Sequence, residues 1–128
     1  MKALTIKQPW ATLIMQGDKR FEFRSWKTNF RGDVLIHAGK GLDKEAVVRL
    51  KKYLPDELPM GKILGKVTIT DCVPMSDEFA KMLSKENSDI YTSHSFSNNY
   101  GFQIENVEVF DTPIDAKGQL GFWNIVLI

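Results

Sequence analysis

Short stretches of alternating apolar and polar residues recur along the chain, and this pattern constrains the fold more than any other feature. Alternation with a period of two indicates a strand with one buried face. The stretches span residues 2–7, 19–26, 34–37, 62–73, 100–110 (with a break after 104) and 122–128. Because only short helical patterns separate them, a doubly wound parallel sheet is excluded. We therefore predict an α+β fold, a small, mostly antiparallel β-barrel of about six strands with two or three flanking short helices.

Three helices are predicted from apolar residues at helical spacing. The first begins at Pro9, carries Trp10 in its apolar stripe and ends at Gly17. Asp43 and Ser76 are each predicted to cap the N-terminus of a further helix. The residues predicted to face the interior are Val47, Leu50 and Leu54 in the second helix and Phe79, Met82 and Leu83 in the third.

Composition excludes several protein classes. With 128 residues, 43% hydrophobic and 26% charged, the chain fits one globular domain over residues 1–128. Its one cysteine, Cys72, rules out a disulfide framework, and no Cys and His residues have zinc-ligand spacing. No apolar run reaches the roughly 20 residues needed to span a bilayer. We expect a cytoplasmic protein without membrane partner, metal or cofactor.

The net charge of +1 hides an asymmetry along the chain. Residues 1–40 carry eight basic and three acidic side chains, a net charge of +5, so the other 88 residues sum to −4. Such a split can place a positive patch on a neutral body, although both signs can equally mix on the folded surface. Lys27, Arg31 and Lys40 are candidates for the rim of such a patch.

Three segments, covering nearly the whole chain in order, resemble the ASCH domain, a branch of the PUA-like superfamily. The first spans residues 4–26, the second 31–40 and the third 117–123. The family signature Gly-x-Lys-x-x-Glu-x-Arg is matched by Gly17, Lys19, Glu22 and Arg24. The resemblance implies a β-barrel with a cleft beside this signature, which binds RNA, nucleotides or modified nucleosides.

The resemblance also implies a second kind of function, an enzymatic activity. Some small relatives are amidohydrolases that remove the acyl group of acetylcytidine with a Lys, a Thr and a separate acidic residue, and others cleave RNA. Lys19 matches the Lys of those enzymes, whereas Glu22 stands where they place the nucleophilic Thr. A carboxylate cannot simply replace an activated hydroxyl, and this departure argues against acyl transfer through this position.

The spacing of the signature residues suggests a polar cleft. Glu22 and Arg24 are two apart on a predicted strand, so their side chains leave one face roughly 7 Å apart. Arg24 offers a planar fork for phosphate or a base edge, and Lys19 offers a point charge. Glu22 would accept from a base amino group or hold the two cations. The alternative is a structural ion pair on a solvated sheet face.

Aromatic residues supply further candidates. Trp26 is predicted on the Glu22 face, where it would stack on a base, although a core position suits a tryptophan equally well. Trp10 and Trp123 are assigned to packing because they lie in apolar stretches. Tyr100 opens a strand and would contact ligand at the cleft mouth, and a packing role fits it as well.

Three polar residues complete the candidate list. Asp71 would serve as acid/base partner of Lys19, or else cap a turn before Pro74. Lys117 belongs to the third family segment and would lie near the same opening, or on the surface. His37, mid-strand among apolar residues, is predicted to be a hydrogen-bonded interior histidine.

Three functions agree with these sequence observations, and they are given in order of preference. The first is binding of RNA, a nucleotide or a modified nucleoside by Lys19, Glu22, Arg24 and Trp26. The second is a hydrolase acting on an acylated nucleoside or on RNA, with Lys19 as base and Glu22 or Asp71 as carboxylate partner. A lysine base must be neutral, whereas nearby carboxylates favour the ammonium. The third is a protein-interaction module that uses the polar segment 84–99, which we predict to be a loop.

Overall fold

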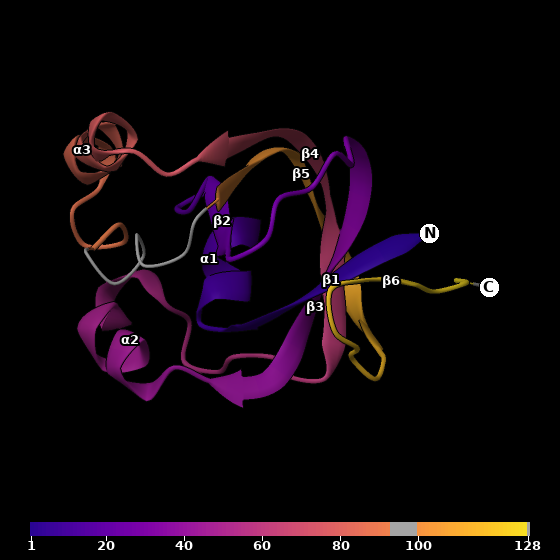
Figure 1. The fold of residues 1–128 in the computed structure, drawn as a ribbon. Helices are drawn as coiled ribbons and strands as arrows, with labels where there is room; N and C mark the ends of the chain where they lie inside the picture. Colours follow the sequence, from indigo (N-terminus) through magenta and orange to yellow (C-terminus); the bar gives the residue numbers. More distant parts are fainter. Residues whose placement is uncertain (93–99, 128) are drawn as a thin grey trace.

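The computed structural model describes residues 1–92 and 100–127 (Figure 1). The elements in chain order are β1 (Lys2–Gln8), α1 (Trp10–Met15), β2 (Phe21–Arg24), β3 (Gly32–Leu42), α2 (Lys44–Arg49), the 3-10 helix η1 (Lys51–Tyr53), β4 (Lys62–Pro74), α3 (Asp77–Glu86), β5 (Tyr100–Asp115) and β6 (Phe122–Asn124). The predicted α+β class, with about six strands and two or three short helices, is confirmed by the six strands and three α-helices of the described residues.

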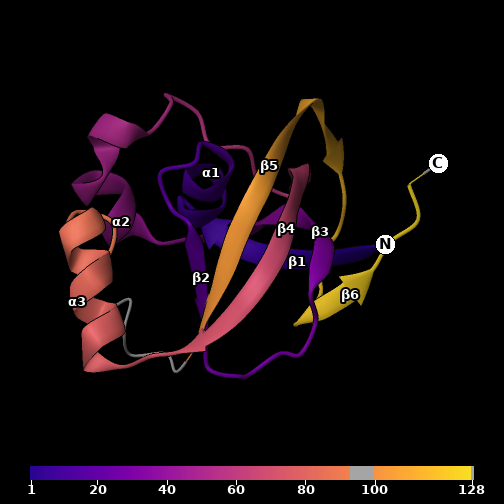
Figure 2. The same cartoon turned by 90° about the horizontal axis from the view of Figure 1, so that it is seen from above.

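All six strands belong to one sheet with the order β2-β5-β4-β3-β1-β6. Neighbours are antiparallel except β1 and β3, which are parallel. The mostly antiparallel sheet agrees with the prediction, but it does not close into a barrel, because no pairing among the described strands joins β2 to β6. These two edge strands have only four and three residues, and they lie at opposite ends of the sheet (Figure 2).

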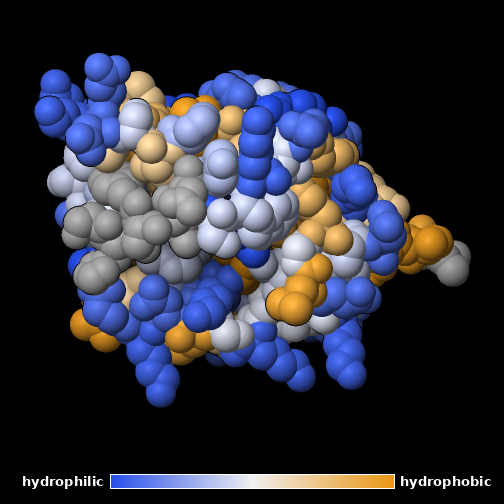
Figure 3. Space-filling model, in the orientation of Figure 1, coloured by the Kyte–Doolittle hydropathy of each residue, from blue (hydrophilic) through white to orange (hydrophobic). Residues whose placement is uncertain are grey.

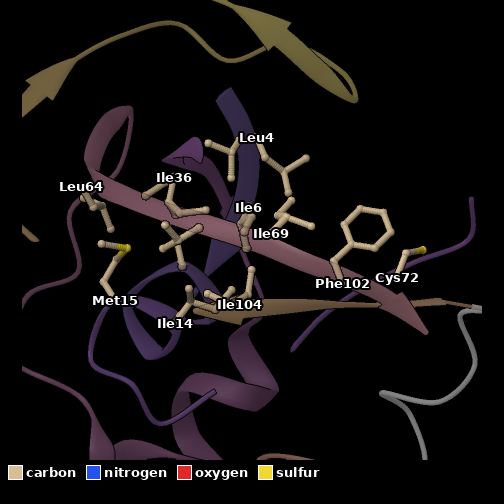
Figure 4. Packing of buried hydrophobic residues seen from close by; sticks show 14 residues of the cluster. Leu4, Ile6, Ile14, Met15, Ile36, Leu64, Ile69, Cys72, Phe102 and Ile104 are labelled. Atoms are coloured by element: carbon tan, nitrogen blue, oxygen red, sulfur yellow. The ribbon is translucent and has the colours of Figure 1, made fainter. Parts of the chain in front are cut away.

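The main hydrophobic core lies between α1 and the sheet. Ile14 and Met15 of α1 pack against β4 and β5, and Figure 4 shows Ile14 beside Ile104 and Met15 beside Leu64. Burying an aliphatic side chain of this size stabilises the fold by roughly 1.5–3 kcal/mol. This packing holds α1 against the sheet. It thereby also fixes the start of the turn that leads from α1 to Lys19.

Irregularities in the long β4/β5 pair change which residues face the core. Alternation predicted Ile63, Val67 and Ile69 on one face, but the register shifts three times between β4 and β5. Val67 and Ile69 consequently pack in the core under α1, whereas Ile63 packs in a separate cluster with Trp123. Gly65 permits this close approach, because a Cβ there would lie 2.2 Å from the carbonyl oxygen of Glu108.

The two predicted N-caps are confirmed. Asp43 Oδ1 accepts from the amide of Ala46 at the start of α2, and Ser76 Oγ accepts from the amide of Phe79 in α3. Helices α2 and α3 lie together at one end of the sheet, and both termini lie at the other (Figures 1 and 2). Met82, predicted to be buried in α3, is 52% exposed, because that helix presents only Phe79 and Leu83 to the interior.

The C-terminal strand is shorter than the predicted 122–128. Strand β6 ends at Asn124, and beyond it Val126 is 81% exposed. Figure 3 shows hydrophobic residues protruding at the C-terminal end, and further hydrophobic atoms in the middle of the same face among hydrophilic ones. Of the predicted loop 84–99, the first three residues belong to α3, and residues 93–99 lie outside the described part of the chain.

Candidate binding site

A cleft of about 810 Å³ opens where β1, α1, β2 and α2 meet. The lining residues are Thr5, Ile6 and Lys7 of β1, Trp10 of α1, Lys19, Glu22, Phe23 and Arg24 in and before β2, Asp43, Glu45 and Arg49 at α2, and Thr92. Segments far apart in sequence therefore form one hollow, and the signature segment supplies four of its residues.

Three charged side chains form the floor of the cleft. Lys19 Nζ lies 3.0 Å from Glu22 Oε1, and Arg24 Nε and Nη2 lie 3.1 and 2.9 Å from Glu22 Oε2. Arg24 Nη2 also donates to the carbonyl oxygen of Thr5 at 2.8 Å. Lys19 and Glu22 are only 3% and 6% exposed. The carboxylate thus holds two cations at fixed positions on the floor.

Burial and the two cations act on Glu22 in opposite directions. Burial raises the pKa of its carboxyl, but the charges of Lys19 and Arg24 and their hydrogen bonds outweigh this and hold the pKa below its ordinary value. Glu22 is therefore ionised at neutral pH. The three residues together carry a net charge of +1.

The turn after α1 directs Lys19 into the cleft. Gly17 has a φ of +84°, a conformation that glycine adopts readily, and it ends the helix as predicted. The amide of Lys19 then donates to the carbonyl oxygen of Leu13 at 3.2 Å. Its ammonium lies 5.2 Å from the ring centroid of Trp10 and 5.0 Å from that of Phe23, and both rings favour a cation.

The opposite wall was not predicted from the sequence. Trp10 Nε1 donates to Asp43 Oδ2 at 3.3 Å, so the cap of α2 also holds a residue that we assigned to packing. Arg49 donates to Glu45 at 2.9 Å and to the carbonyl oxygen of Asp89. No spacing rule relates Trp10 to Asp43, 33 positions away. Their helical context was visible in the sequence, but their contact was not.

The structure places four other candidate residues outside this lining. Trp26 packs edge-on against Phe102, with ring centroids 5.1 Å apart. Asp71 has a half-exposed side chain near Arg31, and Tyr100 pairs with Arg24 across β2 and β5 and packs on the main core. Lys117 lines a second hollow near Lys40.

The charge of the cleft comes partly from outside the first 40 residues. Lys27, Arg31 and Lys40 are not among the lining residues, whereas Lys7 and Arg49 are. The basic lining residues are Lys7, Lys19, Arg24 and Arg49, and the acidic ones are Glu22, Asp43 and Glu45. The lining is thus of mixed charge and net positive by one, and the three rim candidates Lys27, Arg31 and Lys40 lie outside it.

Two residues that were predicted to lie in the interior, His37 and Trp123, are buried. His37 is buried, with Nδ1 at 3.1 Å from Thr5 Oγ1 and Nε2 at 2.7 Å from the carbonyl oxygen of Ala116. Trp123 is buried and donates to Thr5 Oγ1. Among the described residues, no three His, Cys, Asp or Glu side chains are grouped to hold a metal ion. No helix in that part of the chain is long and apolar enough to cross a membrane.

Comparison with known proteins shows the family. The ASCH domain model matches residues 4–112. Activating signal cointegrator 1 from Mus musculus and from Homo sapiens are each 29% identical over 133 residues, covering 95% of this chain. The match covers 22% of those relatives, so the chain spans about a fifth of their length.

A solved structure has the same fold. The crystal structure of ASCH from Zymomonas mobilis matches with a TM-score of 0.59 at 13% identity, covering 89% of this chain and 72% of that one. At this identity the similarity concerns the fold, with its open, mostly antiparallel sheet and short helices. Because the family match extends over most of the sequence, the chain belongs to the ASCH domain family.

Proposed function

We propose that the cleft binds RNA, a nucleotide or a modified nucleoside, with Lys19, Glu22 and Arg24 as its floor. The observation that carries this proposal is a trio of charged groups at the bottom of an open hollow, of which Lys19 and Glu22 are buried and Arg24 is 22% exposed. Taking charges out of water costs several kcal/mol each, and hydrophobic packing would be at least as stable. A binding role accounts for this cost better than a structural one.

The size and charge of the cleft favour a small ligand. A volume of about 810 Å³ lies in the range of small-molecule sites, roughly 300–1,000 Å³. A long duplex would need many basic contacts along its phosphates, whereas the lining is net positive by one. One nucleoside, or one nucleotide of a short single strand, suits this site.

A hydrolase acting on an acylated nucleoside or on RNA is the second proposal. The contact between Lys19 and Glu22 in the cleft supports it, since an amine and a carboxylate can share proton transfer. However, Lys19 is only 3% exposed, and its ammonium already contacts Glu22 and two aromatic rings, which leaves little access for a substrate. Asp71, the other carboxylate that we considered, does not line the cleft. Binding is therefore favoured.

The binding proposal is tested by titrating the protein with cytidine, uridine, acetylcytidine and short single-stranded RNA. Arg24→Ala should weaken binding of the preferred ligand by about tenfold or more, because a charged hydrogen-bond donor is lost. Arg31→Ala, at a surface site outside the cleft, is the matched control. The variant Arg24→Lys keeps a cation beside Glu22, so weaker binding by this variant is not explained by loss of the fold.

Equal binding by Arg24→Ala, Arg24→Lys and the parent protein would contradict the proposal. The same samples should be followed for release of acetate and for RNA fragments. Turnover that Lys19→Ala abolishes would support the hydrolase instead. A protein partner bound without any nucleoside or RNA would support the interaction module.

A further inference from the structure

The hydrogen-bond donors of Arg24 are unevenly used. Its Nε–H donates to Glu22 Oε2, and Nη2 is shared between that carboxylate and the carbonyl oxygen of Thr5. These hydrogen bonds use two of the five N–H groups. Among the described residues Nη1 makes no hydrogen bond, and the Arg24 side chain is 22% exposed in the floor of the cleft.

This distribution decides which ligand groups Arg24 can bind. Arginine recognises phosphate best with two parallel N–H···O bonds from two neighbouring nitrogens. Both such pairs in a guanidinium include Nη2, which already donates to the carbonyl oxygen of Thr5 and lies 2.9 Å from the Glu22 carboxylate. The two hydrogens of Nη1 remain, on a single nitrogen. Each suits a single acceptor atom such as a carbonyl oxygen.

The surroundings of Arg24 also disfavour a phosphate on the floor. Both oxygens of Glu22 are engaged by cations, and Lys19 is almost fully buried beneath the surface. Asp43 and Glu45 add two carboxylates to the same lining, where Lys7 and Arg49 are the further cations and Arg49 is paired with Glu45. A phosphate would meet these negative charges without an arginine fork, whereas an uncharged ring with a carbonyl group would meet one available donor.

We infer that the floor of the cleft recognises a carbonyl oxygen of an uncharged heterocycle, the base of a nucleoside, through Arg24 Nη1, and does not bind phosphate there. This inference rests on the proposed function and assigns the part of the ligand that enters the cleft. Glu22 is in this arrangement a positioning residue, because it orients Arg24 and leaves one nitrogen for the ligand.

The test compares ligands that differ in one group, by calorimetric titration of the intact protein. The first comparison is uridine against uridine 5′-monophosphate, with inorganic phosphate as competitor. The second sets inosine against purine riboside, which lacks the carbonyl oxygen. It also sets uridine against 2,4-dithiouridine, in which weaker sulfur acceptors replace the two carbonyl oxygens. We expect uridine and its monophosphate to bind within about threefold, and loss of the carbonyl acceptor to cost about tenfold.

A variant separates recognition from stability. Arg24→Lys keeps a charge for Glu22 but provides no second nitrogen for the ligand. The preference for inosine over purine riboside, or for uridine over its dithio analogue, should fall to within about twofold. The control Arg31→Lys, outside the cleft, should keep the full preference. A purely structural role of Arg24 would change both affinities together and leave their ratio unchanged.

Two outcomes would overturn the inference, and they differ from failure of the proposed function. Displacement of uridine by inorganic phosphate, with tighter binding of the monophosphate by about tenfold, would make the floor a phosphate site while nucleotide binding stands. An unchanged ligand ratio in Arg24→Lys would remove Arg24 as the discriminating residue. Absence of binding by every nucleoside and by RNA would remove the proposed function itself.

Discussion

Among single residues, Glu22 is the one on which both the stability of the fold and the shape of the cleft depend most. Its carboxylate is buried and accepts from Lys19 and Arg24, so it maintains the geometry of the cleft floor. A carboxylate in such a place is stable only while both cations remain. The same residue therefore links the stability of the fold to the shape of the site.

Replacing Glu22 by glutamine should destabilise the protein. The Glu22→Gln change leaves two cations without their counter-charge in a buried place, and we expect a loss of about 3 kcal/mol or more in the free energy of unfolding. Urea denaturation followed by circular dichroism measures this loss. Glu45→Gln is the control, since its exposed pair with Arg49 is worth only about 0.5 kcal/mol. Equal effects of both changes would contradict this view of Glu22.

The lowered pKa of the Glu22 carboxyl predicts that acid destabilises the folded protein. Because the pKa of its carboxyl in the folded protein lies below the ordinary value of 4.5, the unfolded chain takes up this proton first as the pH falls. The contribution of Glu22 is thus complete above about pH 5 and is lost as the pH falls through the folded-state pKa. Denaturation curves of the parent protein and Glu22→Gln between pH 7 and pH 3 should converge. Curves that stay equally far apart at every pH would argue against this assignment.

At the level of elements, helix α2 has two roles. Asp43 caps its N-terminus with Oδ1 and binds the indole of Trp10 with Oδ2, while Arg49 at its other end lines the same cleft. A six-residue helix contributes little stability by itself. Its placement by Asp43 builds one wall of the site.

The two N-caps offer a matched comparison. Asp43→Ala and Ser76→Ala should each cost about 1 kcal/mol of stability, because each exposes one amide at a helix start. Only Asp43→Ala should also weaken ligand binding, since it releases Trp10 from its hydrogen bond at the cleft. Thermal melting and ligand titration of both variants check this. Weaker binding by Ser76→Ala to the same degree would show a general effect of stability.

The elements were largely predictable from local sequence. Asp43 and Ser76 were identified as caps because the capping hydrogen bond is local and joins the side chain to an amide of the helix that follows it. The faces of β4 were not predictable, since Ile63 and Val67 are separated by shifts in register that depend on the contacts between β4 and β5. The predicted closed barrel failed for a similar reason, because sheet closure depends on how edge strands meet.

Over the whole molecule, charge is distributed rather than concentrated. The chain has a net charge of +1, and the lining of the cleft also sums to +1. Several basic residues of the N-terminal segment lie elsewhere: Arg31 is near Asp71, and Lys40 is at the second hollow. The molecule therefore has a compact site instead of a long basic surface.

Binding of single-stranded RNA should accordingly depend little on salt. If about one phosphate is neutralised, the slope of log affinity against log salt is about −0.7. Affinity should then fall by less than about fourfold between about 50 and 300 mM KCl. Fluorescence anisotropy with a labelled short oligonucleotide measures this. A fall of about a hundredfold or more would require several phosphate contacts and a basic surface beyond the cleft.

The sequence by itself determined the strand pattern, the helix caps, the family signature and the closeness of Glu22 to Arg24, because each depends on residues near one another along the chain. Only the tertiary structure decided that Trp10 and Arg49 join that signature while Trp26, Asp71, Tyr100 and Lys117 lie outside the cleft lining. The pairing of Arg24 with Thr5, which leaves one nitrogen for a ligand, was likewise invisible in the sequence. Such contacts join segments distant in the chain, and their geometry depends on how α1, α2 and the sheet pack together.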